Sequence, residues 1–187
     1  MEFGSNNSMT YMRPRKWWMR LVNTLTKHQS VSIYDQYEEY AIRYFDLRIG
    51  FSKGGHAVFK NGCVWYRTFS LYQYLSFLDK RGDTKVRFSL DEDSRKCGTE
   101  TVERFRKLCH IIEEIYPNVA FFGGCSLGDN NPLYVFKNRG HDYCEMPEAR
   151  YGRFSRLIPQ IGAWLHNGKE SEETKMPVVY RDFVEIQ

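Results

Sequence analysis

Hydrophobic residues recur with a helical period in some stretches of the chain and with a period of two in others. Residues 33–40 and 100–116 carry apolar side chains three and four positions apart, which predicts amphipathic helices. Residues 41–51 alternate between apolar and polar side chains, which predicts a strand with one polar face. Helical and extended segments follow one another from residue 30 onward, which is typical of an α/β fold.

Shorter patterns occupy the intervals between these segments. Ser70 and Gln73 form a capping box and Gly82 suits a helix end, so a helix is expected between them. The other expected elements are an extended segment over residues 57–66 that is interrupted at Asn61 and Gly62, strands over 85–91, 118–124, 132–137 and 178–186, and a helix over 154–165. About six strands are expected in all.

The composition indicates one domain. The 187 residues, 42% hydrophobic and 16% aromatic, suffice for one buried core and are too few for two ordinary domains. Residues 1–8 have the character of an expression scar followed by polar padding, so the domain is expected over residues 9–187. No apolar run is long enough to span a bilayer, so a soluble protein is expected. The five cysteines lack paired or zinc-like spacing, which favours a reducing, cytoplasmic compartment and no bound metal.

Basic residues gather around Trp17 and Trp18, although the net charge of +4 is mild. Such a cluster either contacts an anionic membrane surface or nucleic acid, or forms a helix that packs its tryptophans and solvates its charges. The packed helix is the preferred interpretation. Peripheral membrane contact through Trp17 and Trp18 is kept as the alternative, and no nucleic acid is expected, because one short cluster is a small footprint.

Asp46 and Arg48 carry the chemistry of the polar face in residues 41–51. Being two residues apart on one strand face, they point the same way and lie about 6–7 Å apart. A guanidinium offers a fixed fork of donors to a phosphate, and the carboxylate either holds it or accepts from a substrate hydroxyl. The alternative interpretation is a structural ion pair.

The segment HQSVSIYDQYEEYAIRYFDLRI, residues 28–49, resembles a stretch of the bacterial-type phosphatidylinositol-specific phospholipases C, an X-domain-like family. The resemblance implies a divergent and shortened version of that family's domain. Family-like residues in and after this segment are Gln29, Ser32, Ile33, Gln36, Ile42 to Arg48, Thr68-Phe69, Ile158-Pro159, His166-Asn167 and Asp182-Phe183-Val184. The resemblance covers about residues 28–187 and implies a TIM-type barrel. A full barrel takes about 250 residues, so an abridged or partly open one is expected.

The resemblance also implies a reaction. In the family, a neighbouring hydroxyl of the inositol attacks the phosphodiester, one histidine acts as base, a second acts as acid, and an arginine neutralises the phosphate. By residue-to-residue matching, the catalytic positions are Asp46, Arg48 and Asn61. Arg87, Ser89 and Asp91 share one face of the strand over 85–91, where the family has polar substrate contacts, and Asp91 is the best candidate of the three. Asn61 stands where the family has the acid, and an asparagine cannot donate that proton. The Gly-Thr-His-Asp-Ser-like motif that carries the base has no match between Trp18 and Gln29.

Two functions remain open from the sequence. The chain is either a phospholipase C-like phosphodiesterase, impaired in proton transfer, or a non-catalytic barrel that binds an anionic ligand or a protein partner. In the first case a phosphodiester or phospholipid head group is the substrate, and His56, five residues before Asn61, is the first candidate for a replacement acid or base. His28, His110 and His141 are more simply surface or core histidines. No cofactor is expected, because the calcium-dependent relatives have additional carboxylates where this chain has Arg48.

Overall fold

The computed structural model of the chain describes residues 2–67, 71–91, 98–126, 132–134, 144–145, 178–182 and 184–185. The helices in these ranges are α1 (Met19–Thr26), α2 (Ile33–Glu38), α3 (Leu71–Arg81) and α4 (Thr99–Ile115). The strands are β1 (Glu2–Ser5), β2 (Tyr44–Phe51), β3 (Ala57–Asn61), β4 (Val64–Trp65), β5 (Lys85–Leu90), β6 (Ala120–Phe122), β7 (Gly124–Ser126), β8 (Pro132–Tyr134), β9 (Cys144–Glu145) and β10 (Val178–Arg181).

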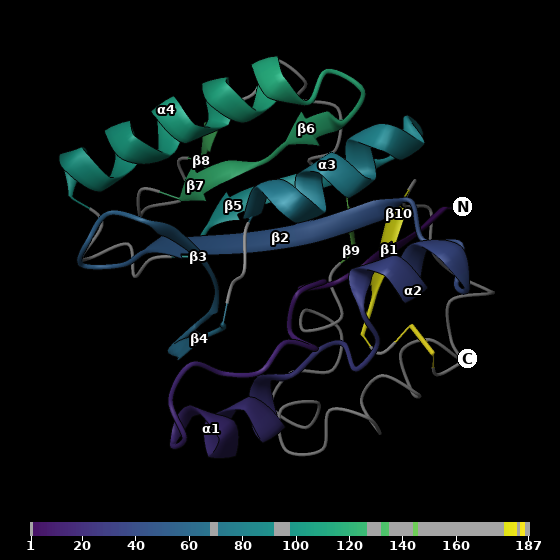
Figure 1. The fold of residues 1–187 in the computed structure, drawn as a ribbon, viewed down its shortest axis with the longest axis horizontal. Helices are drawn as coiled ribbons and strands as arrows, with labels where there is room; N and C mark the ends of the chain where they lie inside the picture. Colours follow the sequence, from purple (N-terminus) through teal and green to yellow (C-terminus); the bar gives the residue numbers. More distant parts are fainter. Residues whose placement is uncertain are drawn as a thin grey trace.

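Parallel strands form the centre of the structure (Figure 1). Within the described residues they lie in the order β9–β10–β1–β2–β5–β6. β2 also pairs with β3, and β3 with β4, both antiparallel, while β7 and β8 form a separate two-stranded sheet. The hydrogen-bonded order of the described strands ends at β6 and β9, so the sheet is open there. The α/β class is confirmed, whereas the barrel that the resemblance implies stays a prediction.

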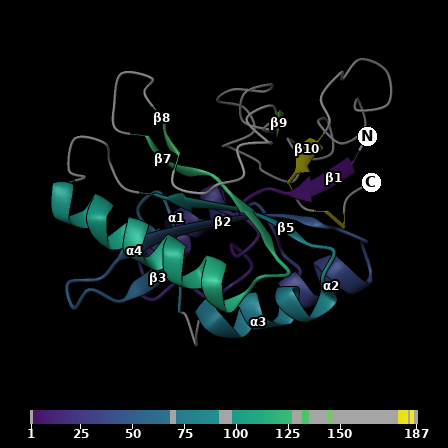
Figure 2. The same ribbon diagram turned by 90° about the horizontal axis from the view of Figure 1, so that it is seen from above.

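α3 and α4 cover one face of the sheet (Figures 1 and 2). The apolar side chains of β2 and β5 point into this layer, where Leu47 and Phe88 are fully buried. Phe88 stacks on Phe105 of α4, with the ring centroids 5.7 Å apart. Burial of one such side chain contributes about 1.5–3 kcal/mol. The apolar half of the alternating pattern therefore fixes the orientation of both strands and turns their polar half to the opposite face.

Most elements expected from the sequence are confirmed with shorter bounds. Ser32 caps α2, since its hydroxyl accepts from the Asp35 N–H at 3.2 Å while the Asp35 carboxylate accepts from the Ser32 N–H at 3.3 Å. The strand expected over 118–124 is divided into β6 and β7 at Gly123, where the backbone has φ +105° and a Cβ would lie 2.7 Å from the carbonyl oxygen of Phe88. The helix expected over 154–165 lies outside the described residues.

Residues 2–8 belong to the sheet and its edge, although the sequence analysis sets them apart from the domain. β1 pairs in parallel with β2 on one side and with β10 on the other. The three residues that follow it, Asn6, Asn7 and Ser8, are buried. An expression scar as the origin of residues 1–8 stays a prediction, but the expectation that they contribute nothing to the fold is wrong.

α1 lies beside β4 (Figure 1), and the hydroxyl of Tyr66, the residue after β4, donates a 2.7 Å hydrogen bond to the Asn23 side chain of α1. Met19 of α1 is buried, but the exposed fractions of Trp17 and Trp18 are 75% and 40%. The interpretation that this helix packs its tryptophans is therefore wrong. Among the described residues, none of the helices has the length and apolar character needed to cross a membrane.

Candidate functional site

Asp46, Arg48, Arg87 and Ser89 form a polar patch across β2 and β5. In the parallel register, Asp46 lies beside Arg87 and Arg48 lies beside Ser89. Because side chains alternate between the two faces of a strand, all four project from the face opposite to α3 and α4. The structure thus brings four of the predicted site residues together, and their roles in binding or catalysis stay predictions.

The Asp46 carboxylate is the centre of this patch and is fully buried. It accepts from Arg48 Nε at 2.8 Å, from Arg87 Nη1 at 3.0 Å and from the Asn7 N–H at 3.2 Å. Burial by itself raises the pKa of Asp46, but the two guanidinium groups outweigh it and hold the pKa below its ordinary value of 3.8. Asp46 is therefore ionised at neutral pH and orients both arginines.

Arg48 retains hydrogen-bond donors after it has bound Asp46. Its second contact with described residues is from Nη2 to the side-chain oxygen of Asn6, at 2.9 Å. A guanidinium has five N–H donors, so these two bonds leave others to a ligand. The side chains of Arg48 and Arg87 are 21% and 31% exposed, and with Asp46 they carry one excess positive charge. Such a group suits an oxyanion.

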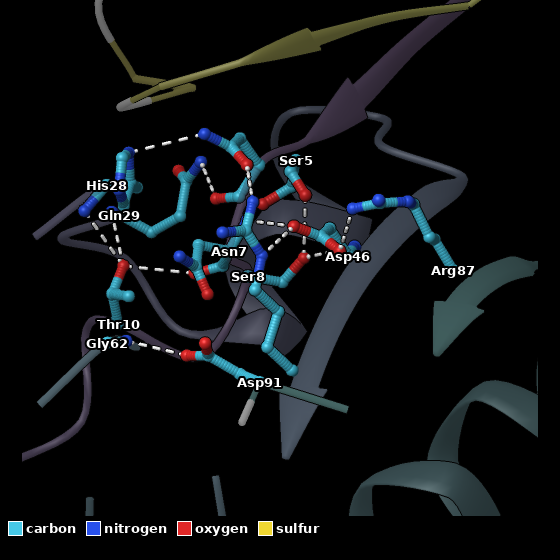
Figure 3. Close-up of polar contacts among 12 residues, drawn as sticks. Ser5, Asn7, Ser8, Thr10, His28, Gln29, Asp46, Gly62, Arg87 and Asp91 are labelled. Atoms are coloured by element: carbon cyan, nitrogen blue, oxygen red, sulfur yellow. Dashed lines mark hydrogen bonds and ion pairs between the residues drawn. The ribbon is translucent and has the colours of Figure 1, made fainter. Parts of the chain in front are cut away.

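The turn that follows β1 lies against Asp46 (Figure 3). The Ser8 N–H donates to the Asp46 carbonyl oxygen at 2.9 Å, and the Asp46 N–H donates to Ser8 Oγ at 3.0 Å. Thr10 Oγ1 accepts from the N–H groups of His28 and Gln29, at 2.9 and 2.8 Å. These bonds fix residues 6–8 between β2 and the segment before α2.

Gln29 and Gln36, two of the family-like residues, hold the same turn from outside the sheet. Gln29 Nε2 donates to the carbonyl oxygens of Asn6 at 3.0 Å and Arg181 at 2.7 Å. Gln36 Nε2 donates to the carbonyl oxygen of Ser8 at 2.9 Å. Gln29 and Gln36 therefore support a turn that lies more than twenty residues earlier in the chain.

Asn6 lies between Arg48 and Asp182 and is fully buried. Its Nδ2 donates to Asp182 Oδ1 at 2.8 Å, and its Oδ1 accepts from Arg48 Nη2. Both polar atoms of the amide are thus engaged. A carboxamide donates and accepts hydrogen bonds but does not titrate near neutral pH. Asn6 positions Arg48 and cannot serve as a general base.

His28 forms a buried pair with Asp182, its Nδ1 lying 2.8 Å from Asp182 Oδ1 and 3.2 Å from Asn6 Nδ2. When Nδ1 carries the proton and donates it to the carboxylate, Nε2 is the basic nitrogen. A carboxylate that holds a histidine in this way is a common arrangement in acid–base catalysis. The sequence gives His28 a structural role because it matches no motif position, and sequence alone could not pair it with a residue 154 positions away.

Residues 4–8, Gly-Ser-Asn-Asn-Ser, stand where the first strand ends. The family's Gly-Thr-His-Asp-Ser-like motif has the same length, the same first and last residues, and follows the first strand. Matched to this motif, Asn6 would stand at the position of the base histidine, and this role stays a prediction. The sequence analysis expects this motif between Trp18 and Gln29, close to α2. The structure instead has its first strand at the start of the chain, where β1 pairs with β2.

The Asn61–Gly62 turn between β3 and β4 holds Asp91. The Gly62 N–H donates to the Asp91 carboxylate at 2.6 Å, and Lys60 Nζ donates to the Asp91 carbonyl oxygen. Asn61 is buried beside Tyr66, where burial raises the pKa of the Tyr66 hydroxyl above its usual range despite the opposing hydrogen bond with Asn61. Asp91 therefore accompanies the Asn61 turn, and a single pocket shared with Asp46 and Arg48 stays a prediction.

His56 lies in the hairpin turn between β2 and β3 and is exposed. It lines a pocket together with Phe51 and Arg104. Phe51 belongs to the apolar face of β2, so this pocket opens on the helix side of the sheet, whereas Arg48 projects from the other side. This placement does not support the catalytic role predicted for His56.

The remaining sequence candidates fall into two groups. His110 is exposed on α4, with its Nδ1 4.0 Å from a Glu113 carboxylate oxygen. His141, Thr68-Phe69, Ile158-Pro159 and His166-Asn167 lie outside the described residues. Within the described part of the chain, no three His, Cys, Asp or Glu side chains come together as metal ligands.

No family model and no curated protein sequence matches this chain. Two solved structures of the phosphatidylinositol-specific phospholipase C of Staphylococcus aureus are similar to it. One, which concerns modulation of that enzyme's membrane binding, is 18% identical, with a TM-score of 0.46 over 74% of this chain and 44% of that one. The other, a point mutant of the same enzyme, is 20% identical, with a TM-score of 0.48 over the same shares. The matched part is thus less than half of the enzyme's length.

Proposed function

We propose that this chain is a non-catalytic phospholipase C-like protein that binds a phosphodiester, such as a phospholipid head group, at Arg48. The observation that carries the proposal is the position of Asn6. Its amide lies between Arg48 and Asp182, and the resemblance would place the proton acceptor for the attacking hydroxyl at this residue. The site thus keeps the group that neutralises a phosphate and lacks the base beside it.

The second proton-transfer position supports the same conclusion. Asn61 stands where the resemblance places the general acid, and an amide cannot protonate a leaving alcohol. Loss of one general acid or base typically lowers a rate by about 10² to 10⁴. With amides at both positions, Arg48 can still bind a phosphate, but neither Asn6 nor Asn61 can transfer a proton.

The donors around Arg48 favour an oxyanion as the ligand. Arg48 and Arg87 together exceed the charge of Asp46 by one. The side-chain nitrogen of Asn7 is buried and has no hydrogen-bond partner among the described residues.

A second candidate function rests on the pair of His28 and Asp182. In this alternative His28 replaces the missing base: Nδ1 donates to the Asp182 carboxylate, Nε2 is then the basic nitrogen, and the ring lies beside the Asn6 amide that contacts Arg48. The chain would then be a slow phosphodiesterase with an altered base. This alternative requires turnover that depends on His28, whereas the binding protein requires none.

The surface around α1 is the proposed contact with a membrane. Trp17 and Leu21 are exposed by 75% and 71%, and the basic residues Arg13, Arg15, Lys16 and Arg20 around them are also exposed. Exposed aromatic and aliphatic side chains among basic ones suit the interface of a bilayer that contains anionic lipids. A peripheral position on such a membrane would bring the chain close to phospholipid head groups.

Calorimetric titration with glycerophosphoinositol, a soluble phosphodiester, tests the proposed function. We expect Arg48→Ala to weaken binding by roughly 10- to 100-fold, since a charged hydrogen bond contributes about 1.5–3 kcal/mol. Arg43→Ala is the matched control, because Arg43 pairs with Asp83 on an exposed surface, and it should bind as the wild type does. Equal affinity of wild type and Arg48→Ala would contradict the assignment of the ligand to Arg48.

A further inference from the structure

A pocket of about 510 Å³ lies between the β2–β3 hairpin and the helices α3 and α4, on the helix side of the sheet. Pockets for small molecules commonly have volumes of about 300–1,000 Å³ and mostly apolar walls with a few polar groups. This pocket has that size. It is separate from the patch around Arg48, since it meets β2 through Phe51, which has the opposite strand parity.

The walls of the pocket are apolar. Phe51 and Val58 line it from the hairpin, Leu71 and Tyr72 from α3, and Ile111 from α4. Tyr72 and Ile111, which both line the pocket, are 45% and 44% exposed. The apolar surface is therefore available to a ligand.

Cationic groups stand at the same pocket. Arg104 and Lys107 line it from α4, and His56 lines it from the hairpin. Among the described residues that line it, none is acidic. Lys107 is exposed and has no ion-pair partner in the part of the chain that the structure describes.

The guanidinium of Arg104 is held in place at the edge of this pocket. It donates to Glu100 at 2.8 Å and lies 5.7 Å from the centroid of the Phe51 ring. Gly55, at φ +80°, allows this position, because a Cβ there would lie 2.7 Å from Arg104 Nη1. The hairpin and α4 thus fix a positive group against an aromatic wall.

We propose that this pocket binds an amphiphilic anion, a small molecule with one phosphate, sulfate or carboxylate head and a short alkyl or aryl tail. The head group lies at Lys107 and Arg104, and the tail lies between Phe51, Tyr72 and Ile111. Charge complementarity selects the anion, and the exposed apolar walls select the tail. The proposal is independent of the ligand at Arg48.

Octyl phosphate, kept below the concentration at which it forms micelles, is the probe. Calorimetric titration should show binding of octyl phosphate and much weaker binding of inorganic phosphate and of octanol. Lys107→Ala and Arg104→Ala should each weaken binding about fivefold, as expected for partly exposed charge pairs. Ile111→Asp should abolish it, because a carboxylate would replace part of the apolar wall and repel the head group.

Two control variants separate this site from the rest of the molecule. Arg106→Ala removes an exposed charge of α4 that pairs with Glu103 and does not line the pocket, so binding should be unchanged. Arg43→Ala, which removes a charge that pairs with Asp83 outside the pocket, should also leave octyl phosphate binding unchanged. Lys107 is exposed, so Lys107→Ala keeps the test valid if Ile111→Asp fails to fold.

Several results would overturn the proposal. Absence of binding, equal affinity for inorganic phosphate, or loss of binding in Arg48→Ala would each show that the pocket is not the site of an amphiphilic anion. Sedimentation of the protein without ligand shows whether it self-associates. Self-association that Ile111→Asp abolishes, together with no octyl phosphate binding, would mean that a second copy of the chain covers this face instead.

Discussion

The side-chain amide of Asn6 donates a hydrogen bond to the Asp182 carboxylate over 2.8 Å and thereby joins the end of β1 to the segment after β10. The two residues are 176 positions apart in the chain. The Asp182 carboxylate accepts from the Asn6 amide and also lies 2.8 Å from Nδ1 of His28. Asn6 and His28 thus share one carboxylate, and position 6 carries no titrating group.

The Asp46 carboxylate should be essential for stability. Asp46→Asn leaves two arginines without their buried counter-charge, and we expect the free energy of unfolding to fall by roughly 3 kcal/mol, at the low end for a broken buried pair because both arginines reach solvent. Asp83→Asn is the matched control, since Asp83 pairs with Arg43 on an exposed surface and should lose less than about 1 kcal/mol. Urea denaturation of the two variants measures both values, and equal losses would contradict the central role of Asp46.

Acid should destabilise the protein through the same carboxylate. The pKa of Asp46 is lower in the folded chain than its ordinary value of 3.8, so its contribution to stability is fully present above that value and is lost as the pH falls below it. We expect the free energy of unfolding to decrease more steeply below about pH 4 in the wild type than in Asp46→Asn. Urea midpoints measured between about pH 3 and pH 6 give both slopes. Identical slopes would show that Asp46 does not titrate differently in the folded state.

The alternation of residues 41–51 and 85–91 was sufficient to predict the polar patch, because strand parity is a local property. Asp46, Arg48 and Arg87 share a face in the structure for that reason. His56 is a candidate only through its nearness in sequence to Asn61, which does not reveal that the hairpin turns it toward α4, and its role stays a prediction.

The place of residues 2–8 in the fold could not be predicted from the sequence. Their composition is that of polar padding, and only pairing of β1 with β2 and β10 shows that they are part of the sheet. The contacts of Asn6 with Arg48 and Asp182 join three segments that are far apart in sequence. Gly-Ser-Asn-Asn-Ser shares its length and its first and last residues with the family motif. The sequence pattern does not reveal, however, that a strand of the sheet begins at residue 2.

His28 should contribute to stability and not to turnover. His28→Asn removes a buried contact with Asp182, so we expect a loss of about 1–3 kcal/mol in the free energy of unfolding. Binding of glycerophosphoinositol should change little, because His28 contacts Asn6 rather than Arg48. Calorimetry and denaturation of this variant check both expectations. Wild-type turnover that disappears in His28→Asn would instead support the altered-base phosphodiesterase.

The exposed residues before and in α1 should control membrane binding. We expect Trp17→Ala and Leu21→Ala each to weaken binding to vesicles of phosphatidylcholine with phosphatidylserine by roughly tenfold, since each removes exposed apolar surface that the interface would bury. Ile115→Ala is the control, because Ile115 is an exposed apolar residue at the end of α4 that lines neither proposed site. Vesicle sedimentation measures the bound fraction. Binding that is the same in all three variants, or that does not weaken with added salt, would contradict a membrane contact at α1.

Release of inositol phosphate from phosphatidylinositol tests the central claim most directly. It should be measured for the wild type, Asn61→His, Asn6→His combined with His28→Ala to make room for the new ring, and all three changes together. We predict no release above the buffer level by the wild type, at most a small gain in Asn61→His, and the largest gain where both histidines are present. Robust wild-type release that Arg48→Ala abolishes would contradict the claim, because proton transfer would then proceed without a titrating group at position 6 or 61.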